Sequence, residues 1–188
     1  MLLDIGLGII WGILFDSASQ AHSLGVFLSV GIASALAPDM DFIYHLATGG
    51  TMKDDHRHRE VFHKPYFLIL GWLIIAAVTD PTLAWLFAAG AAGHFIHDSV
   101  GIGWGVQWLA PFKNDHYTFL YRVHTADKPA PPKKLLYVWP NQDIDKLNKR
   151  YGDDNWFANT YLKWHPFAIF ELAVFILALA ALFWYASG

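Results

Sequence analysis

The sequence alternates between hydrophobic runs and polar segments. Five runs stand out, at residues 5–15, 24–37, 66–79, 83–96 and 167–186. Continuous runs of this kind predict helices that are buried or that face lipid. Only the last run has the twenty or so residues that a straight membrane span needs. The other four are expected either to cross a membrane as tilted or extended helices or to lie inside a compact bundle.

The charged residues indicate how these helices would be oriented. Asp80 and Pro81 separate the third run from the fourth and predict a hairpin. All 13 Lys and Arg fall within residues 53–64 and 113–163, which the hairpin would place on one side of a membrane. The excess of positive charge makes that side the cytoplasmic one. A multi-pass membrane protein is therefore expected.

The first fifteen residues resemble a signal peptide only in being apolar. Asp4 occupies a position where a signal peptide has Lys or Arg, and Ser17-Ala18-Ser19 is a poor cleavage site. We therefore expect a retained first helix. The predicted fold class is all-α: a polytopic or membrane-embedded helical bundle with a C-terminal transmembrane helix.

The region between the fourth and fifth runs is polar. Residues 127–134 are rich in Pro and cannot be helical, whereas residues 141–151 have the spacing of a weak amphipathic helix. The predicted organisation is a membrane-associated helical domain at 1–112, a polar lid or interface segment at 113–165, and the transmembrane helix at 166–188.

Composition limits the chemistry that the chain can perform. Hydrophobic residues make up 55% of the chain and charged residues 15%, which is typical of a membrane protein. The net charge of −3 gives no electrostatic support for binding nucleic acid, so membrane lipids and a small-molecule or lipid substrate are the expected partners. Because Cys is absent, a metal ion would have to be bound by His and carboxylate side chains.

Three polar motifs interrupt this hydrophobic sequence. The first is Asp39 and Asp41 after Pro38, and the second is His58 and His63 in a charged loop. In the third, His94 and Asp98 are four residues apart and share one face of a helix, whereas His97 points about a hundred degrees away. Separately, the motifs could be a helix cap, a solvated loop and a core histidine. Together they favour a His and carboxylate site for zinc or a related divalent ion, because polar groups are costly beside membrane segments.

The order and spacing of these motifs resemble the YdjM-like family of inner-membrane-associated proteins, which are assigned as metal-dependent hydrolases. The resemblance covers residues 24–112 and includes the segment from Gly105-Val106 to Pro111-Phe112 that follows the third motif. It departs from the family pattern at Glu60, Phe62 and Lys64, where the family has small residues. The family is grouped with zinc-dependent phospholipase C and P1-type nucleases, so the resemblance implies an all-helical enzyme with clustered zinc.

The resemblance implies that Asp41, His58 or His63, His94 and Asp98 bind the metal, with Asp39 either a further ligand or a partner of one. In the hydrolysis itself, Asp39 would act as the general base and Arg57 or Arg59 would bind a phosphate group. His22 is the one upstream histidine in the right order to be a further ligand, but the predicted topology places it on the opposite side of the membrane. The residues expected to bind the metal are Asp41, His58, His63, His94 and Asp98.

The resulting hypothesis is a hydrolase in the inner membrane that cleaves a phosphoester of a lipid or another membrane-near substrate. Its metal site would face the cytoplasm, and the metal would most simply be zinc. The first alternative is a membrane protein whose metal is structural, with all four coordination positions filled. A cation transporter ranks last, because the hydrophobic runs contain almost no ionisable residues.

Overall fold

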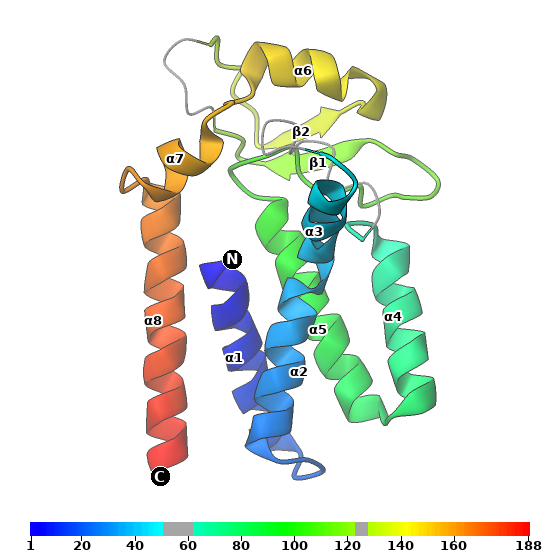
Figure 1. The fold of residues 1–188 in the computed structure, drawn as a ribbon, viewed down its shortest axis with the longest axis vertical. Helices are drawn as coiled ribbons and strands as arrows, with labels where there is room; N and C mark the ends of the chain where they lie inside the picture. The colour runs from blue at the N-terminus through cyan, green and yellow to red at the C-terminus, as the bar shows by residue number, and fades with distance from the viewer. Residues whose placement is uncertain (51–61, 123–127) are drawn as a thin grey trace. The chain divides into compact units, whose positions relative to one another are not determined.

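The computed structural model describes residues 1–50, 62–122 and 128–188, which form two compact units (Figure 1). The first unit contains Met1–Pro38, Phe67–His97 and Ile169–Gly188, and the second contains Asp39–Tyr66 and Asp98–Ala168. The chain is mostly helical, as predicted, but it also has a two-stranded sheet.

The first unit is built from the five hydrophobic runs, and every run forms a helix. The α4–α5 hairpin turns at Asp80, as predicted, and the Asp80 Oδ1 atom accepts the N–H groups of Thr82 and Leu83 at 2.7 and 3.2 Å. This contact caps the start of α5. The helices are α1 (Leu2–Ala18), α2 (Leu24–Leu36), α4 (Pro65–Val78), α5 (Pro81–Asp98) and α8 (Pro166–Ser187).

Glycines allow α1 and α2 to approach closely. A Cβ atom on Gly8 would lie 2.6 Å from the Cα atom of Ile32, a distance that real Cβ atoms do not show. Gly31 faces Gly8 from α2, so neither helix presents a side chain at the crossing. Small residues hold helices together in this way in lipid, where apolar burial alone drives little association.

Gly8→Ala is expected to destabilise the protein by about 1–3 kcal/mol, because the two backbones must move apart. Gly25→Ala is the matched control, because a Cβ atom there meets nothing nearer than the Ser23 hydroxyl at 3.9 Å. Thermal unfolding in detergent should show a lower melting temperature for Gly8→Ala alone. Equal melting temperatures for the two variants would contradict the close packing of α1 on α2.

Two helical stretches are long and apolar enough, by length and composition, to cross a membrane. One is α8, as predicted. The other is Leu24–Ala47, where α2 continues through the 3-10 turn η1 (Ala37–Asp39) into α3 (Met40–Ala47). The expectation from the sequence that only the last hydrophobic run is long enough for a straight span was therefore wrong. Pro38 falls in the short 3-10 turn between the two helices, where a missing N–H is tolerated.

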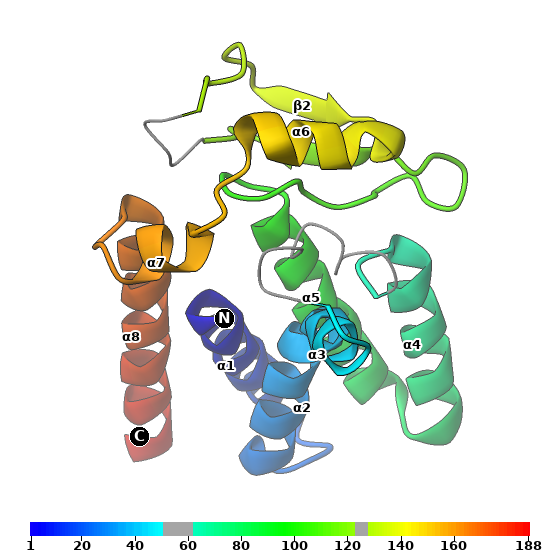
Figure 2. The same cartoon turned by 45° about the horizontal axis from the view of Figure 1, so that its top comes forward.

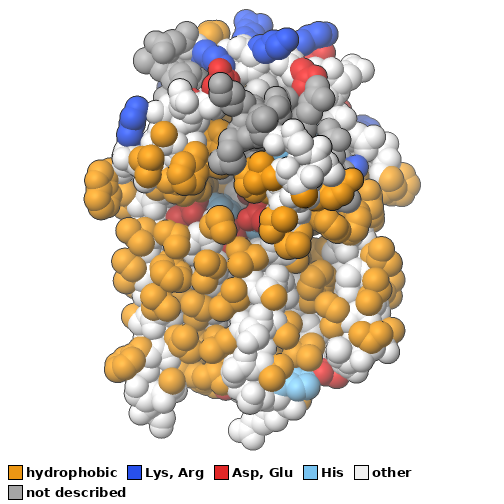
Figure 3. Space-filling model, in the orientation of Figure 1, with side chains coloured by type: hydrophobic (Ala, Val, Ile, Leu, Met, Phe, Trp, Pro, Cys, Tyr) orange, Lys and Arg blue, Asp and Glu red, His pale blue; other side chains and the backbone are white. Residues whose placement is uncertain are grey.

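The outer surface of the first unit is apolar and contains no Lys or Arg. All 13 cationic side chains belong to the second unit, whereas the first unit carries Asp4, Asp16, Asp80 and Glu171. Figure 3 shows hydrophobic side chains over α4 and α8. More than half of each of the following side chains is exposed: Ile69, Leu73, Ile74 and Val78 on α4, and Phe170, Leu177, Phe183 and Trp184 on α8.

The second unit has a small aromatic core between a hairpin and a helix. Strands β1 (His116–Phe119) and β2 (Leu136–Trp139) pair antiparallel, with His116 opposite Trp139. Figure 2 shows α6 (Ile144–Tyr151) alongside the strands. The 3-10 turn η3 (Asn141–Asp143) precedes α6, and α7 (Trp156–Tyr161) leads towards α8. The buried side chains of this core are Trp104, Tyr137, Trp139, Ile144 and Tyr151.

The two strands correct the all-α prediction. Each strand has only four residues, so its alternation of buried and exposed positions is too short to be distinguished in the sequence. The amphipathic helix expected at residues 141–151 is confirmed as η3 and α6. The Pro-rich segment is non-helical from residue 128 onward, also as predicted.

Candidate metal centre

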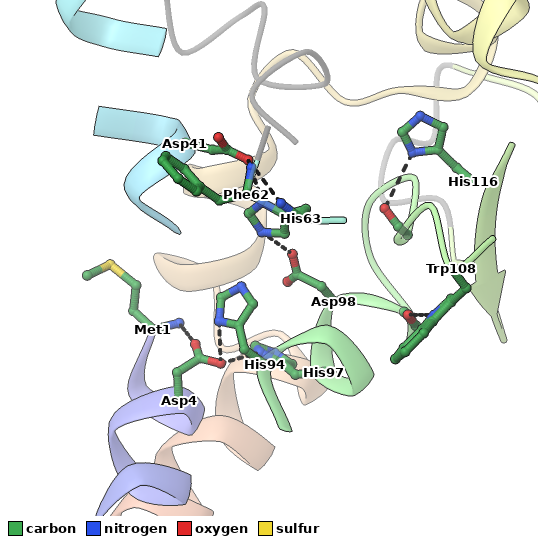
Figure 4. Close-up of polar contacts among 12 residues, drawn as sticks. Met1, Asp4, Asp41, Phe62, His63, His94, His97, Asp98, Trp108 and His116 are labelled. Carbon is green, nitrogen blue, oxygen red and sulfur yellow. Dashed lines mark hydrogen bonds and ion pairs between the residues drawn. The ribbon is translucent and has the colours of Figure 1, made fainter. Parts of the chain in front are cut away.

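Asp41 and His63 form the buried base of the candidate site. Asp41 lies in the first turn of α3 and His63 lies two residues before α4; neither side chain is accessible to solvent. The Asp41 Oδ2 atom accepts the backbone N–H groups of Phe62 and His63 at 2.6 and 3.2 Å, and it lies 3.0 Å from the Nδ1 atom of the His63 ring (Figure 4). Asp41 therefore fixes both the backbone and the ring of His63.

The other ring nitrogen of His63 faces a second carboxylate. The distance between His63 Nε2 and the Oδ2 atom of Asp98, the last residue of α5, is 3.2 Å. A carboxylate oxygen of Asp39, in η1, lies within 4.8 Å of a ring nitrogen of His63. The second unit thus brings together residues from all three sequence motifs.

His94 lies one turn before Asp98 in α5 and has the same kind of environment as His63. Its side chain is buried, and its Nδ1 atom lies 3.1 Å from the Oδ1 atom of Asp4. A carboxylate on Nδ1 orients an imidazole and leaves Nε2 as the donor for a metal ion. Each histidine therefore has a carboxylate beside its Nδ1 atom, through a hydrogen bond for His63 and an ion pair for His94.

The donor atoms suit a divalent transition metal. Among the described residues of the second unit, Asp39 and His63 each offer one ligand atom, and these two atoms lie within 4.8 Å of each other. Imidazole and carboxylate together favour zinc and its neighbours over calcium or magnesium, which prefer oxygen donors alone. The residues present therefore fit the divalent ion expected from the sequence.

Comparison with known proteins places the chain in a family. The family model described as YdjM inner membrane protein matches residues 4–187. The chain belongs to this family. No curated protein and no solved structure matches it. The YdjM match extends well beyond the motif region at 24–112 and includes the polar region and α8. None of these comparisons supports the wider likeness to phospholipase C and P1 nuclease.

Two of the predicted site residues of this YdjM family member lie outside the described residues. They are His58, predicted as a metal ligand, and Arg59, predicted to bind phosphate. Their roles stay predictions from the sequence.

The sequence analysis missed a second group of buried polar residues in this YdjM family member. His97 shares the Asp4 Oδ1 atom with His94, at 3.0 Å from its own Nδ1 atom, although the two rings leave the helix in different directions. The His97 Nε2 atom lies 3.5 Å from Oε1 of Glu171, which is fully buried in α8. Asp4 and Glu171 each interrupt an apolar run. A charged side chain is energetically costly in such a run, and this was the signal that could have identified both residues.

His22 is not a ligand of a site that contains His94. Its Nε2 atom lies 2.5 Å from the Oδ2 atom of Asp80, so it joins the α1–α2 connection to the α4–α5 turn. From Asp80 to His94 the chain follows α5 for about 20 Å, at the rise of an α-helix. His22 and His94 therefore lie near opposite ends of α5.

The contact between His22 and Asp80 predicts a dependence of stability on pH. The hydrogen bond from His22 holds the pKa of Asp80 below its ordinary value, against a smaller opposing effect of desolvation. The ionised carboxylate is therefore favoured in the folded state, and its contribution to stability is lost as the pH falls below about 4. Asp80→Asn should remove this part of the pH dependence of the melting temperature. An unchanged profile in that variant would contradict the assignment.

Proposed function

We propose that this protein is a multi-pass inner-membrane hydrolase that uses one divalent metal ion, with zinc as the first choice, to cleave a phosphoester of a membrane-near substrate. Asp39 and His63 of the second unit would donate to the ion, and His94 would be the third donor, the role that its sequence motif predicts. The observation that carries this proposal is the environment of His63. Asp41 fixes its Nδ1 atom at 3.0 Å, and its Nε2 atom faces Asp98 at 3.2 Å.

Three protein donors are the number found in catalytic zinc sites, where the remaining position holds water or substrate. The bound ion would lower the pKa of that water towards about 7 and polarise the phosphoryl oxygen. Asp98 would accept the proton of that water at its Oδ2 atom. This atom lies 3.2 Å from His63 Nε2, the nitrogen that would donate to the ion. The proposal therefore exchanges the sequence-based roles of Asp39 and Asp98. Asp39, and not Asp98, belongs to the group of donor atoms.

The choice of a phosphoester rests on the family resemblance and on the placement of charge. Every Lys and Arg belongs to the second unit, which also contains Asp39, His63 and Asp98. Cationic side chains attract anionic substrates, and Arg binds phosphate oxygens in pairs. The same distribution supports a cytoplasmic location for the second unit and a membrane location for the first.

A structural metal is the second candidate, and the short distance between His63 and Asp98 favours it. If Asp98 fills the fourth position, the ion ties α5 to the segment before α4 and leaves no place for water. The protein would then bind metal and hydrolyse nothing.

Asp98→Asn separates the two candidates. For the hydrolase, the purified variant should keep near-stoichiometric metal by elemental analysis. It should lose about 10²–10⁴-fold of its activity on bis(p-nitrophenyl) phosphate or short-chain phosphatidylcholine. For the structural site, the variant should lose the metal, and the wild-type protein should cleave neither substrate. Wild-type protein without bound metal, even after reconstitution with zinc, would contradict both.

A further inference from the structure

We infer that Asp4 of α1 and Glu171 of α8 are positioning residues for the metal ligand His94, so that the first and last helices both contribute to the affinity of the metal site. This inference rests on the proposed function, because it assumes that His94 binds the ion. It differs from the sequence-based interpretation, in which α8 is a membrane anchor and Asp4 is only evidence against a signal peptide.

Asp4 lies beside two imidazoles, as a hydrogen-bond partner of His97 and an ion-pair partner of His94. Its Oδ1 atom lies 3.1 Å from His94 Nδ1 and 3.0 Å from His97 Nδ1, and its side chain is 1% exposed. An acceptor at Nδ1 places the ring proton there and leaves Nε2 with its lone pair. The charge of Asp4 beside His94 Nδ1 therefore favours the tautomer of His94 that can bind a metal, and the ion pair holds the His94 ring next to α1 (Figure 4).

Glu171 extends the same network to α8. Its Oε1 atom lies 3.5 Å from His97 Nε2, and the carboxylate is fully buried in a helix that is otherwise apolar. His97 is thus held between two carboxylates, one from α1 and one from α8. Because His97 and His94 share Asp4, a change at Glu171 reaches His94 through two intervening side chains.

Charge explains why this network belongs to a site. The first unit has no Lys or Arg to pair with buried carboxylates. Asp4 and Glu171 lie beside the two histidines, and they also contact the amino group of Met1, at 2.9 and 3.5 Å. Buried carboxylates are costly, and a simple packing role would be filled at lower cost by apolar side chains. Carboxylates beside a histidine are the groups that commonly orient it as a metal ligand, and both of these carboxylates lie beside the histidine pair.

The test compares the metal affinity of Asp4→Asn and Glu171→Gln with that of wild type and Asp16→Asn. Asp16 is the matched control, because it lies in the same helix as Asp4 and its carboxylate accepts a hydrogen bond from Tyr185 at 2.8 Å. It has no contact to any histidine that the structure describes. Zinc affinity would be measured by competition with a chelating dye, and the site geometry by the visible spectrum of the cobalt-substituted protein.

Asp4→Asn should weaken zinc binding by about 10–100-fold and change the cobalt spectrum. Glu171→Gln should give a smaller loss, and Asp16→Asn should match wild type. Asp4→Glu, which restores a carboxylate, should recover part of the affinity. It also keeps the test decisive if Asp4→Asn folds poorly.

Three results would overturn the inference. They are wild-type affinity in Asp4→Asn, an equal loss in Asp16→Asn, or two metal ions in wild type with one lost in Asp4→Asn. The last result would make Asp4 the ligand of a second ion. A wild-type protein that binds no metal would instead reject the proposed function itself, so the two failures are distinguishable.

Discussion

His63→Ala is expected to remove the bound metal and all metal-dependent hydrolysis. The substitution deletes the imidazole whose two nitrogens face Asp41 and Asp98, at 3.0 and 3.2 Å. Without it, the carboxylates of Asp41 and Asp98 lose an imidazole partner, and the second unit loses the imidazole donor that its described residues supply to the proposed site. Elemental analysis of the detergent-purified protein should fall from near one metal ion per chain to background.

Loss of metal must be separated from loss of folding, because breaking a buried pair of this kind costs about 3–5 kcal/mol. His116→Ala is the matched control. His116 is also a buried histidine of the second unit, and its Nε2 atom lies 2.9 Å from Asn141 Oδ1. That variant should be destabilised yet keep its metal. If both variants lose metal equally, the loss reports unfolding; if His63→Ala keeps its metal, the proposed site is wrong.

Leu177→Lys should prevent stable integration of α8 into the membrane. Leu177 lies near the middle of α8 and is 66% exposed on the surface of a unit that has no Lys or Arg. Replacing Leu with Lys near the centre of a span costs about 3 kcal/mol on insertion scales. After alkaline carbonate extraction, most of the variant should be absent from the membrane fraction or degraded.

The comparison for this variant is Leu135→Lys. Leu135 is 70% exposed and precedes β2 in the second unit, which contains all 13 Lys and Arg of the chain. It should remain in the membrane fraction at the wild-type level. An intact membrane fraction for Leu177→Lys would show that this face of α8 does not meet lipid.

The helices were predictable because each hydrophobic run is long and ends at a clear signal. Pro81 and Asp80 mark the α4–α5 turn in the sequence, and the structure places the turn there. The strands were not predictable in the same way. Tyr137 and Trp139 point into the aromatic core only because α6 covers them, and this contact joins residues that no local pattern relates.

The candidate site was predictable in part. Spacing placed His94 and Asp98 on one helix face, and the motif order led to Asp41 and His63. The partner of each ring nitrogen could not be predicted, because it depends on which carboxylate lies within about 3 Å after folding. Asp4 and Glu171 were missed for the same reason, since their partners are far away in the sequence.

The contact between His97 and Asp4 joins residues 93 positions apart and has a consequence for biosynthesis. At about 5–20 residues per second, a ribosome needs roughly 5–20 s to make α5 after α1. During that interval Asp4 lacks both of its imidazole partners, and an unpaired carboxylate resists transfer into lipid. In the proposed multi-pass protein, α1 would therefore complete its insertion only after α5 arrives, and a later segment of the chain would govern the integration of α1.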